Sequence, residues 1–349
     1  MGGRFPALAL AITGYIVSIP IYCDSGFIIL NSIRKHLVKT HKASPVFLST
    51  VLGTALYATH TLVPPTPGPL AAAAANLQIS DHLPLVMLSG MAVSVVAVVV
   101  GFLWGLYSQR YEVKEGQFER KVFPDQPEKQ RQVGFFVSFL PVLAPILLIT
   151  VSGLVGKGED GIWQWLVFFG QPANALLVGL ACCWPLISKS PRGGLEVYMT
   201  KGLEAGGKIA LIVGCGGAFG LVLRASDFSQ LLTSNELLVG FGLFLPFLMG
   251  AIIKTSEGMA TVALITSSAL IEPLLPLLGL DSVTGRMLAL LACGGGSMTV
   301  AHVNDSFFWV IAEFSGMDTM TALKSITIAT FLQGISVLIT VQILGWWLL

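Results

Sequence analysis

The sequence predicts an all-α polytopic membrane protein, organised as an inverted repeat with two re-entrant hairpins and two discontinuous helices. Three observations support this fold class: an apolar composition, positive charge confined to a few loops, and a pattern of polar interruptions that occurs twice. The 349 residues are 54% hydrophobic and 11% charged, with a mean hydropathy of +0.78, whereas soluble domains are about 25% charged. Most of the long apolar runs can cross a bilayer, which takes ~20 residues; they lie at 83–107, 134–156, 163–188, 206–223, 236–253, 286–296 and 325–349.

The composition also narrows the function classes. The net charge is +1 and the basic residues are spread over short loops, so nothing indicates a nucleic-acid partner. The cysteines lie in or beside apolar segments and form no C-x-x-C pair. We therefore expect buried free thiols without disulfides, and we expect no metal and no cofactor. These cysteines are Cys23, Cys182, Cys183, Cys215 and Cys293.

The basic loops indicate an orientation, because positive charge gathers on the cytoplasmic side of a membrane. Loops 34–42, 108–133 and 189–208 are rich in lysine and arginine and should lie inside. The acidic loop 157–162 should lie outside, and so should 225–235.

The longest charged loop divides the chain into two halves. We expect a first transmembrane repeat over residues 1–107, a cytoplasmic charged linker over 108–133, and a second transmembrane repeat over 134–349. We expect this first repeat to be incomplete at its N-terminal side, since the three spans expected before the second hairpin have no counterpart before the first.

One unit, a broken hairpin followed by a broken helix, occurs in both halves. The first hairpin has apolar arms around "PIYCDSG" at 20–26, and the second has them around "KTSEG" at 254–258. Positions 24 and 256, at the two breaks, are 232 residues apart. The broken helices contain "HTLVPPTPGP" at 60–69 and "GGGSMTVAHVND" at 294–305. The first unit starts from the inside and the second from the outside, which is the inverted repeat found in many secondary transporters.

Proline and glycine explain why these helices should break. The prolines at 64, 65, 67 and 69 cannot continue a helix, and the glycines at 294–296 weaken one. Irregular backbone at membrane depth is tolerated where it lines a cavity, and the exposed N-termini of half-helices favour an anion.

The four interruptions are therefore expected to converge near the bilayer midplane and to form a polar pocket. Ionisable side chains at that depth are costly, so they favour a functional interpretation. The expected pocket residues are Asp24, Ser25, Gly26, Pro65, Gly68, Ser256, Glu257, Gly258, Gly296, Ser297, Thr299, His302, Asn304 and Asp305.

Plainer interpretations stay open for several of these side chains. Asp24 and Glu257 fit aqueous loops if the hairpin arms cross the membrane fully. His302 and Asp305 fit a pair that only holds two helices together. Three further side chains lie outside the expected pocket. His60 fits a packed, neutral histidine, and Lys254 and Arg224 fit side chains that snorkel to a membrane interface.

Four motifs, in order along nearly the whole chain, resemble the gluconate permease (GntP) family: "LVPPTPGPLAAA", "GCGGAFGLVLRAS", "EGMATVALITSSALI" and "GGGSMTVAHVNDSFFW". The resemblance implies a fold similar to that of other ion-transporter-superfamily carriers. It implies proton symport of gluconate, related sugar acids, glycerate-type hydroxy acids or D-serine across the bacterial cytoplasmic (inner) membrane. It also implies a homodimer as an option.

The sequence departs from the family pattern in two places. The first hairpin tip reads "YCDSG" at 22–26, where the family usually has an aromatic and an acidic residue before Val-Gly. The repeat symmetry also predicts roughly 100 further residues before the first hairpin. A mis-called start, a true truncation and dependence on a partner all fit this difference, so an inactive fragment or subunit stays an alternative.

The expected function is import of a small organic anion by proton symport, not enzyme catalysis. Half-helix N-termini near Gly68 and Gly296 would hold the substrate carboxylate, and serine, threonine and asparagine side chains its hydroxyl groups. His302 and Asp305 would move the proton, with Asp24 or Glu257 as alternatives. Sodium coupling is the other open mechanism. A membrane enzyme using His302 and Asp305 is disfavoured, because no nucleophile is paired with a base.

Overall fold

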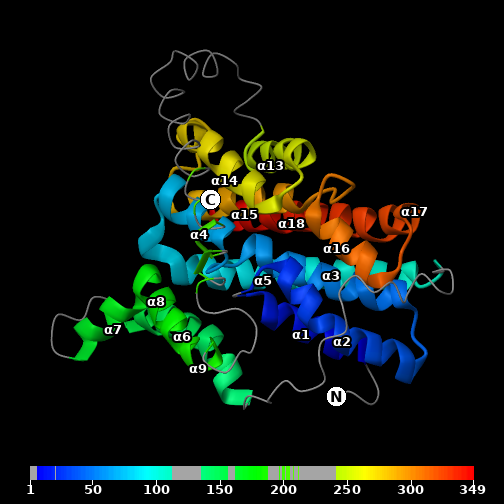
Figure 1. Ribbon diagram of the computed structural model, residues 1–349. Coiled ribbons are helices and arrows are strands. Elements are labelled where there is room, and N and C mark those ends of the chain that lie inside the picture. Colours follow the sequence, from blue (N-terminus) through cyan, green and yellow to red (C-terminus); the bar gives the residue numbers. More distant parts are fainter. Residues whose placement is uncertain are drawn as a thin grey trace. The chain divides into compact units, whose positions relative to one another are not determined.

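The computed structural model describes residues 6–19, 21–111, 135–155, 162–187, scattered positions between 196 and 211, and 241–349 (Figure 1). Over these ranges all regular structure is helical and no strand occurs, which confirms the predicted all-α class. The chain forms two compact units. The larger contains Met1–Ser80, Val86–Val122 and Ile212–Leu349, and the smaller contains Asp81–Leu85 and Phe123–Leu211. The predicted boundaries of the two repeats stay a prediction.

The first half of the larger unit is a series of helices with sequence-encoded ends. Ser44 accepts a hydrogen bond from the Phe47 N–H at 3.4 Å and so caps α3, with Pro45 at its first position. Helix α3 ends before the Pro64–Pro65 pair, and Pro67 starts the next helix. The elements are α1 (Pro6–Ser18), α2 (Cys23–His41), α3 (Pro45–Leu62), α4 (Pro67–Ala71), the π-helix η1 (Ala72–Asn76), the 3₁₀ helix η2 (Ser80–His82) and α5 (Leu83–Ser108). The stretch Asp81–Leu85, which includes the end of η2 and the start of α5, belongs to the smaller unit.

In the second half of the larger unit, too, the helix ends are set by residues that cap or terminate helices. Gly258 ends α13 in the left-handed region, at φ +83°. Ser282 caps α15, and Asp305 caps α16. The elements are α13 (Phe244–Glu257), α14 (Ala260–Ile271), the 3₁₀ helix η3 (Glu272–Leu274), α15 (Val283–Met298), α16 (Ser306–Ser315), α17 (Thr319–Ala322), the π-helix η4 (Leu323–Thr327) and α18 (Ile328–Leu348).

The two groups of helices pack in matching ways. Helices α1 and α2 contact each other and α3, just as α13 and α14 contact each other and α15. The short helices after the breaks cross between the groups, because α4 contacts α14 and α16 contacts α2 (Figure 1). This order of contacts is what two copies of one unit would give. The inverted relation of the copies and the re-entrant nature of the hairpins stay predictions.

The glycine triplet does not break its helix, contrary to the sequence expectation. Gly294, Gly295 and Gly296 all lie inside α15, and the chain leaves the helix only after Met298. A Cβ at Gly294 would lie 2.8 Å from the Leu62 side chain of α3, and one at Gly295 would lie 2.6 Å from Val337 of α18. A Cβ at Gly296 would collide with the Phe247 carbonyl of α13. The triplet therefore lets three helices approach α15 at one level, which small residues permit in membrane proteins.

Arg34 lies in a different setting from the one predicted. Loop 34–42 was expected to be cytoplasmic and charged, whereas α2 continues to His41 and the Arg34 side chain is fully buried. Its guanidinium donates to the Asn31 side chain at 2.6 and 3.0 Å, to the Ser49 hydroxyl at 2.7 Å and to the Phe314 carbonyl at 2.7 Å. Arg34 thus fastens α2 to α3 and to the end of α16.

The smaller unit contains α6 (Phe135–Val155), α7 (Ile162–Gly170), α8 (Pro172–Cys182) and α9 (Trp184–Ile187). Within α6, Pro141 and Pro145 interrupt the regular hydrogen bonds. The predicted span 163–188 is not one straight helix, because α7 and α8 meet at a bend of 83°. The predicted segments 206–223 and 225–235 lie largely or wholly outside the described residues.

Three described helical stretches are long and apolar enough to cross a membrane: Pro45–Asn76, Ser80–Ser108 and Thr319–Leu348. The bent pair of α7 and α8 would be a fourth if it counts as one span. These stretches support a multi-pass membrane protein. The expected number of about ten membrane elements stays a prediction.

Candidate functional site

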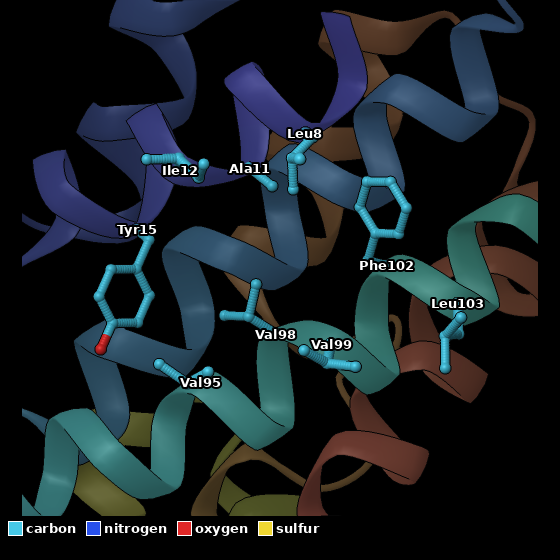
Figure 2. Close-up of a pocket in the computed structure, with 9 residues that line it drawn as sticks. All are labelled: Leu8, Ala11, Ile12, Tyr15, Val95, Val98, Val99, Phe102 and Leu103. Atoms are coloured by element: carbon cyan, nitrogen blue, oxygen red, sulfur yellow. The ribbon is translucent and has the colours of Figure 1, made fainter. Parts of the chain in front are cut away.

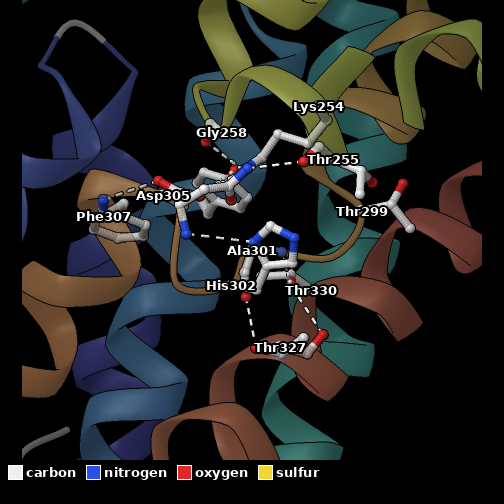
Figure 3. A network of polar contacts seen from close by, with 12 residues as sticks. Lys254, Thr255, Gly258, Thr299, Ala301, His302, Asp305, Phe307, Thr327 and Thr330 are labelled. Atoms are coloured by element: carbon white, nitrogen blue, oxygen red, sulfur yellow. Dashed lines mark hydrogen bonds and ion pairs between the residues drawn. The ribbon is translucent and has the colours of Figure 1, made fainter. Parts of the chain in front are cut away.

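A buried ion pair joins α13 to the loop before α16 in the larger unit (Figure 3). The Lys254 ammonium on α13 donates to Asp305 Oδ2 at 2.7 Å, and the two side chains are 0% and 3% exposed. The ammonium also donates to the Gly258 carbonyl at 2.5 Å, at the end of its own helix. A buried pair of this kind is costly unless both charges are well solvated by the protein, so the surrounding contacts matter.

Two hydrogen bonds hold the Asp305 carboxylate in addition to the ammonium. Oδ1 accepts from the Phe307 N–H at 2.9 Å, as the N-cap of α16. Oδ2 also accepts from the Tyr57 hydroxyl of α3 at 3.2 Å. The Tyr57 ring stacks on the Phe307 ring, with centroids 5.3 Å apart. Charge-assisted bonds to a backbone N–H and a hydroxyl are the contacts that make a buried carboxylate tolerable.

The irregular segment between α15 and α16 is held by hydrogen bonds to η4, α18 and α13. The Ala301 N–H donates to Thr330 at 3.0 Å, and the Ala301 carbonyl accepts from Thr327 at 2.6 Å (Figure 3). The Asn304 amide donates to the Thr255 carbonyl at 2.8 Å. These bonds satisfy backbone groups that a helix would otherwise have used, so Asp305 is presented on a well-supported loop.

A small cavity of about 60 Å³ opens beside Asp305. Its lining comes from α2, α3, α14 and α16 and from the breaks next to them. The lining residues are Tyr22, Cys23, Asp24, Tyr57, His60, Met259, Ala260, Thr261, Asp305, Ser306 and Phe307. Water needs about 10–15 Å³ of such space, and drug-sized ligands occupy pockets of about 300 Å³ or more. The cavity therefore fits a few waters and has to widen to admit a sugar acid.

Two polar atoms at this cavity have no hydrogen-bond partner among the described residues: Asp24 Oδ1 and His60 Nδ1. The other ring nitrogen of His60 lies 3.2 Å from the Thr261 hydroxyl of α14, and the imidazole lies against the Tyr22 ring. His60 is only 4% exposed. Since buried polar atoms are nearly always hydrogen-bonded, the two orphan atoms indicate a place for a polar ligand or water.

The predicted pocket residues separate into three groups. Asp24 and Asp305 line the cavity. Seven others are buried in helix contacts or loops: Gly26, Pro65, Gly68, Gly258, Gly296, Ser297 and Thr299. The Ser297 hydroxyl has no hydrogen-bond partner in the part of the chain that the structure describes. Ser25, Ser256, Glu257 and Asn304 are exposed and His302 is half-buried, and none of these five lines the cavity. The functional role of every one of them stays a prediction.

Two structural expectations about this region were wrong. Gly296 does not lie at a half-helix N-terminus, because it is inside α15 and packs against α13. The half-helix that follows the second break begins at Ser306, and its N-terminus is already capped by the Asp305 carboxylate. Snorkelling of Lys254 to an interface is also wrong, since the side chain is completely buried.

Sequence reasoning missed the aromatic and hydroxyl side chains that line the cavity. Tyr22, Tyr57 and Thr261 were not selected, and His60 was interpreted as a packed histidine. A signal was available for α3, because Tyr57 and His60 lie three residues apart and so share a helix face just before the proline break.

A larger cavity, of about 280 Å³, has no polar chemistry to offer (Figure 2). It lies between α1 and α5, and its lining is apolar except for Tyr15, whose hydroxyl donates to the Met91 carbonyl at 2.9 Å. The lining residues are Leu8, Ala11, Ile12, Tyr15, Val95, Val98, Val99, Phe102 and Leu103. An anionic substrate needs charge or donors, so the smaller cavity is the better candidate.

Comparison with known proteins identifies relatives over almost the whole chain. Residues 1–346 match the family described as GntP family permease. An uncharacterised permease of Haemophilus influenzae is 30% identical, over 99% of this chain and 74% of that protein. The gluconate permease of Pseudomonas aeruginosa is 27% identical over 91% and 72%. The D-serine transporter DsdX of Escherichia coli is 27% identical over 93% and 74%. No solved structure matches the chain.

Proposed function

Because the chain belongs to the GntP family of permeases, we propose that it imports a small hydroxylated organic acid by proton symport. The substrate would be gluconate, a related sugar acid or a glycerate-like hydroxy acid. The location would be the bacterial cytoplasmic membrane, with several passes through the bilayer. The single observation that carries the proposal is the buried Lys254–Asp305 pair beside a cavity with two unsatisfied polar atoms.

The names of the relatives support a substrate that has a carboxylate and a nearby hydroxyl group. One is a gluconate permease and another a D-serine transporter, and both of those compounds combine a carboxylate with hydroxyl groups. Such a substrate needs a positive charge for its carboxylate and neutral or acceptor groups for its hydroxyls. The cavity region offers these in Lys254, His60 and Asp24.

The proposed substrate position lies among α2, α3, α14 and α16. His60 and Thr261 would bind one hydroxyl group and Asp24 would accept from another. The contacts between α4 and α14 and between α16 and α2 support a site that elements of both halves share, as in carriers built from inverted repeats. Gly68, at the N-terminus of α4, lies close to Thr261: a Cβ built on Gly68 would be 3.5 Å from that residue. The peptide dipoles at this helix end would favour the substrate's negative charge.

Asp305 is the proposed proton carrier. It is the buried carboxylate at the cavity whose charge is balanced by an ammonium. Ionisable groups of this kind form proton relays in membrane carriers. His302, three residues before Asp305, would exchange the proton with the aqueous side, since it is only half-buried.

Uptake into cells that lack other gluconate carriers tests the proposal. Cells making the chain receive labelled gluconate, glycerate or D-serine, with and without a proton uncoupler and with sodium present or replaced by potassium. Proton symport is supported if the uncoupler abolishes accumulation and if accumulation is the same with sodium as with potassium. Accumulation that requires sodium would instead favour the sodium-coupled alternative, and no uptake of any acid would count against the transporter assignment.

A further inference from the structure

The Lys254 ammonium has contacts that do not depend on Asp305, so it can stay in place if Asp305 no longer pairs with it. The ammonium has three N–H donors, and within the described residues two of them are used, on Asp305 and on the Gly258 carbonyl. The Gly258 carbonyl belongs to the end of the same helix, so it holds the ammonium in place independently of Asp305. The remaining donor, together with the one that Asp305 occupies, is available to a ligand.

Asp305 belongs both to the ion pair and to the cavity lining. Its carboxylate contacts Lys254, and Asp305 is one of the residues that line the cavity, whereas Lys254 is not. Its Oδ1 is held by the Phe307 N–H, which keeps the side chain capping α16 even without the ammonium. A ligand carboxylate that replaces Oδ2 on Lys254 would need Asp305 to be neutral, because Oδ2 now accepts from both the ammonium and the Tyr57 hydroxyl.

We propose that Lys254 is the ligand for the substrate's carboxylate and that a proton on Asp305 releases it for that purpose. This inference rests on the proposed function and names the step at which proton and anion are coupled. A buried ammonium without a counter-charge is strongly unfavourable. Protonated Asp305 without substrate is therefore disfavoured, and so is an anion next to ionised Asp305.

Two states of the site keep the local charge balanced. In the empty state Lys254 is paired with ionised Asp305. In the loaded state Lys254 is paired with the substrate carboxylate, and Asp305 carries one proton as a neutral acid. The proton enters on a carboxylate oxygen and no bond to carbon changes. The exchange predicts one proton for each negative charge on the substrate.

Other titratable groups also face Asp305, and they limit the interpretation of a pH profile. Within the described residues they are Tyr57 and His60 from α3, Cys23 and Asp24 from α2, Lys254 from α13, and His302 in the same loop. A single variant of Asp305 separates its contribution from theirs, because Asp305→Asn keeps the N-cap acceptor while removing the proton site.

Binding of labelled gluconate, glycerate and D-serine to the purified full chain, from pH 5.5 to 8.5, tests the inference. Wild-type protein should bind at least one acid more tightly as the pH falls. Asp305→Asn leaves the Lys254 ammonium without a counter-charge, so the empty variant should be less stable than the wild type and should bind that acid tightly at every pH. Exposed Lys39→Met and Asp81→Asn are matched controls and should behave like the wild type.

Lys254→Met alone leaves a buried carboxylate unpaired and is prone to misfold. The double variant Lys254→Met/Asp305→Asn removes both charges, so it should fold. It should nevertheless bind the acid about 10- to 100-fold more weakly than Asp305→Asn, the range for losing a hydrogen bond to a charged group. The uncharged amide of the same acid should bind both variants equally.

The outcomes distinguish the two levels of the proposal. Binding of no acid by wild-type protein would overturn the proposed function and the inference with it. Wild-type binding together with equal affinities of the double variant and Asp305→Asn would overturn the inference alone, leaving the pair a purely structural contact. A pH-dependent affinity that persists in Asp305→Asn would also overturn it.

Discussion

Gly296 in α15 lies directly against the carbonyl of Phe247 in α13, with no room for a side chain between them. Gly250, one turn further along α13, is packed in the same way against the Cys293 carbonyl of α15, where a Cβ would lie 2.5 Å from the oxygen. The close crossing places Lys254, one turn beyond Gly250, within reach of the loop that follows α15. The ion pair therefore depends on two glycines that are outside the cavity.

The substitution Gly296→Ala should lower stability and transport together. A methyl group there meets backbone atoms, which cannot turn away as a side chain would, and such overpacking costs about 1–3 kcal/mol. Thermal unfolding of the purified protein in detergent measures the loss. Gly202→Ala, where no atom of the described residues lies within 4 Å of the added methyl, is the matched control and should lose no stability. Equal melting temperatures for the two variants would contradict the close crossing.

The substitution His60→Ala should weaken binding of hydroxylated acids without unfolding the protein. Losing one neutral hydrogen bond costs about 0.5–1.5 kcal/mol, so KM should rise by about 2- to 10-fold. Kinetics of uptake with gluconate and with an acid of the same length that lacks hydroxyl groups separate this effect from a general loss. Exposed His82→Ala is the control. A KM that changes equally for both acids would contradict a contact between His60 and a substrate hydroxyl.

The substitution Asp24→Asn should change affinity but leave proton coupling intact. Asp24 Oδ1 is buried at the cavity and no described residue donates to it. An amide can still accept one hydrogen bond from a substrate hydroxyl. A KM change of up to about 10-fold is expected, together with unchanged sensitivity of uptake to an uncoupler. Loss of uncoupler sensitivity in this variant would move the proton-carrying role from Asp305 to Asp24.

The substitution Arg34→Lys should destabilise the protein while leaving KM unchanged. Arg34 donates to Asn31, Ser49 and the Phe314 carbonyl, and an ammonium cannot reproduce that planar geometry. A loss of about 1–3 kcal/mol is expected from unsatisfied buried groups. Thermal unfolding measures it, with exposed Arg110→Lys as the control. A changed KM without lost stability would mean that Arg34 acts on the substrate site instead.

The backbone breaks were largely predictable from local chemistry. Pro64 and Pro65 end α3 where expected, since proline lacks a donor and excludes the helical conformation before it. The second break was placed too early, because Gly294–Gly296 were taken as helix breakers. In a tightly packed helix bundle the absence of a side chain is used for close approach, so these glycines stay in α15 and the break falls at 299–305.

The site itself could be predicted only in part. Asp24 and Asp305 were selected because carboxylates in apolar segments are rare, and both line the cavity. Lys254 lies 51 residues from Asp305, and Tyr57 lies 248 residues from it, so no local pattern links them. Ser256 fits the repeat spacing, yet its hydroxyl donates to the Ile252 carbonyl of its own helix. The spacing of the repeated motifs located the helix breaks, whereas the contacts of Asp305 with Lys254 and Tyr57 depend on how the helices cross.

Uptake of labelled gluconate, glycerate and D-serine into cells making this chain, with and without a proton uncoupler, tests the central claim most directly. We predict accumulation of at least one of these acids, abolished by the uncoupler and unaffected when potassium replaces sodium. Accumulation that persists in full with the uncoupler present would contradict proton symport.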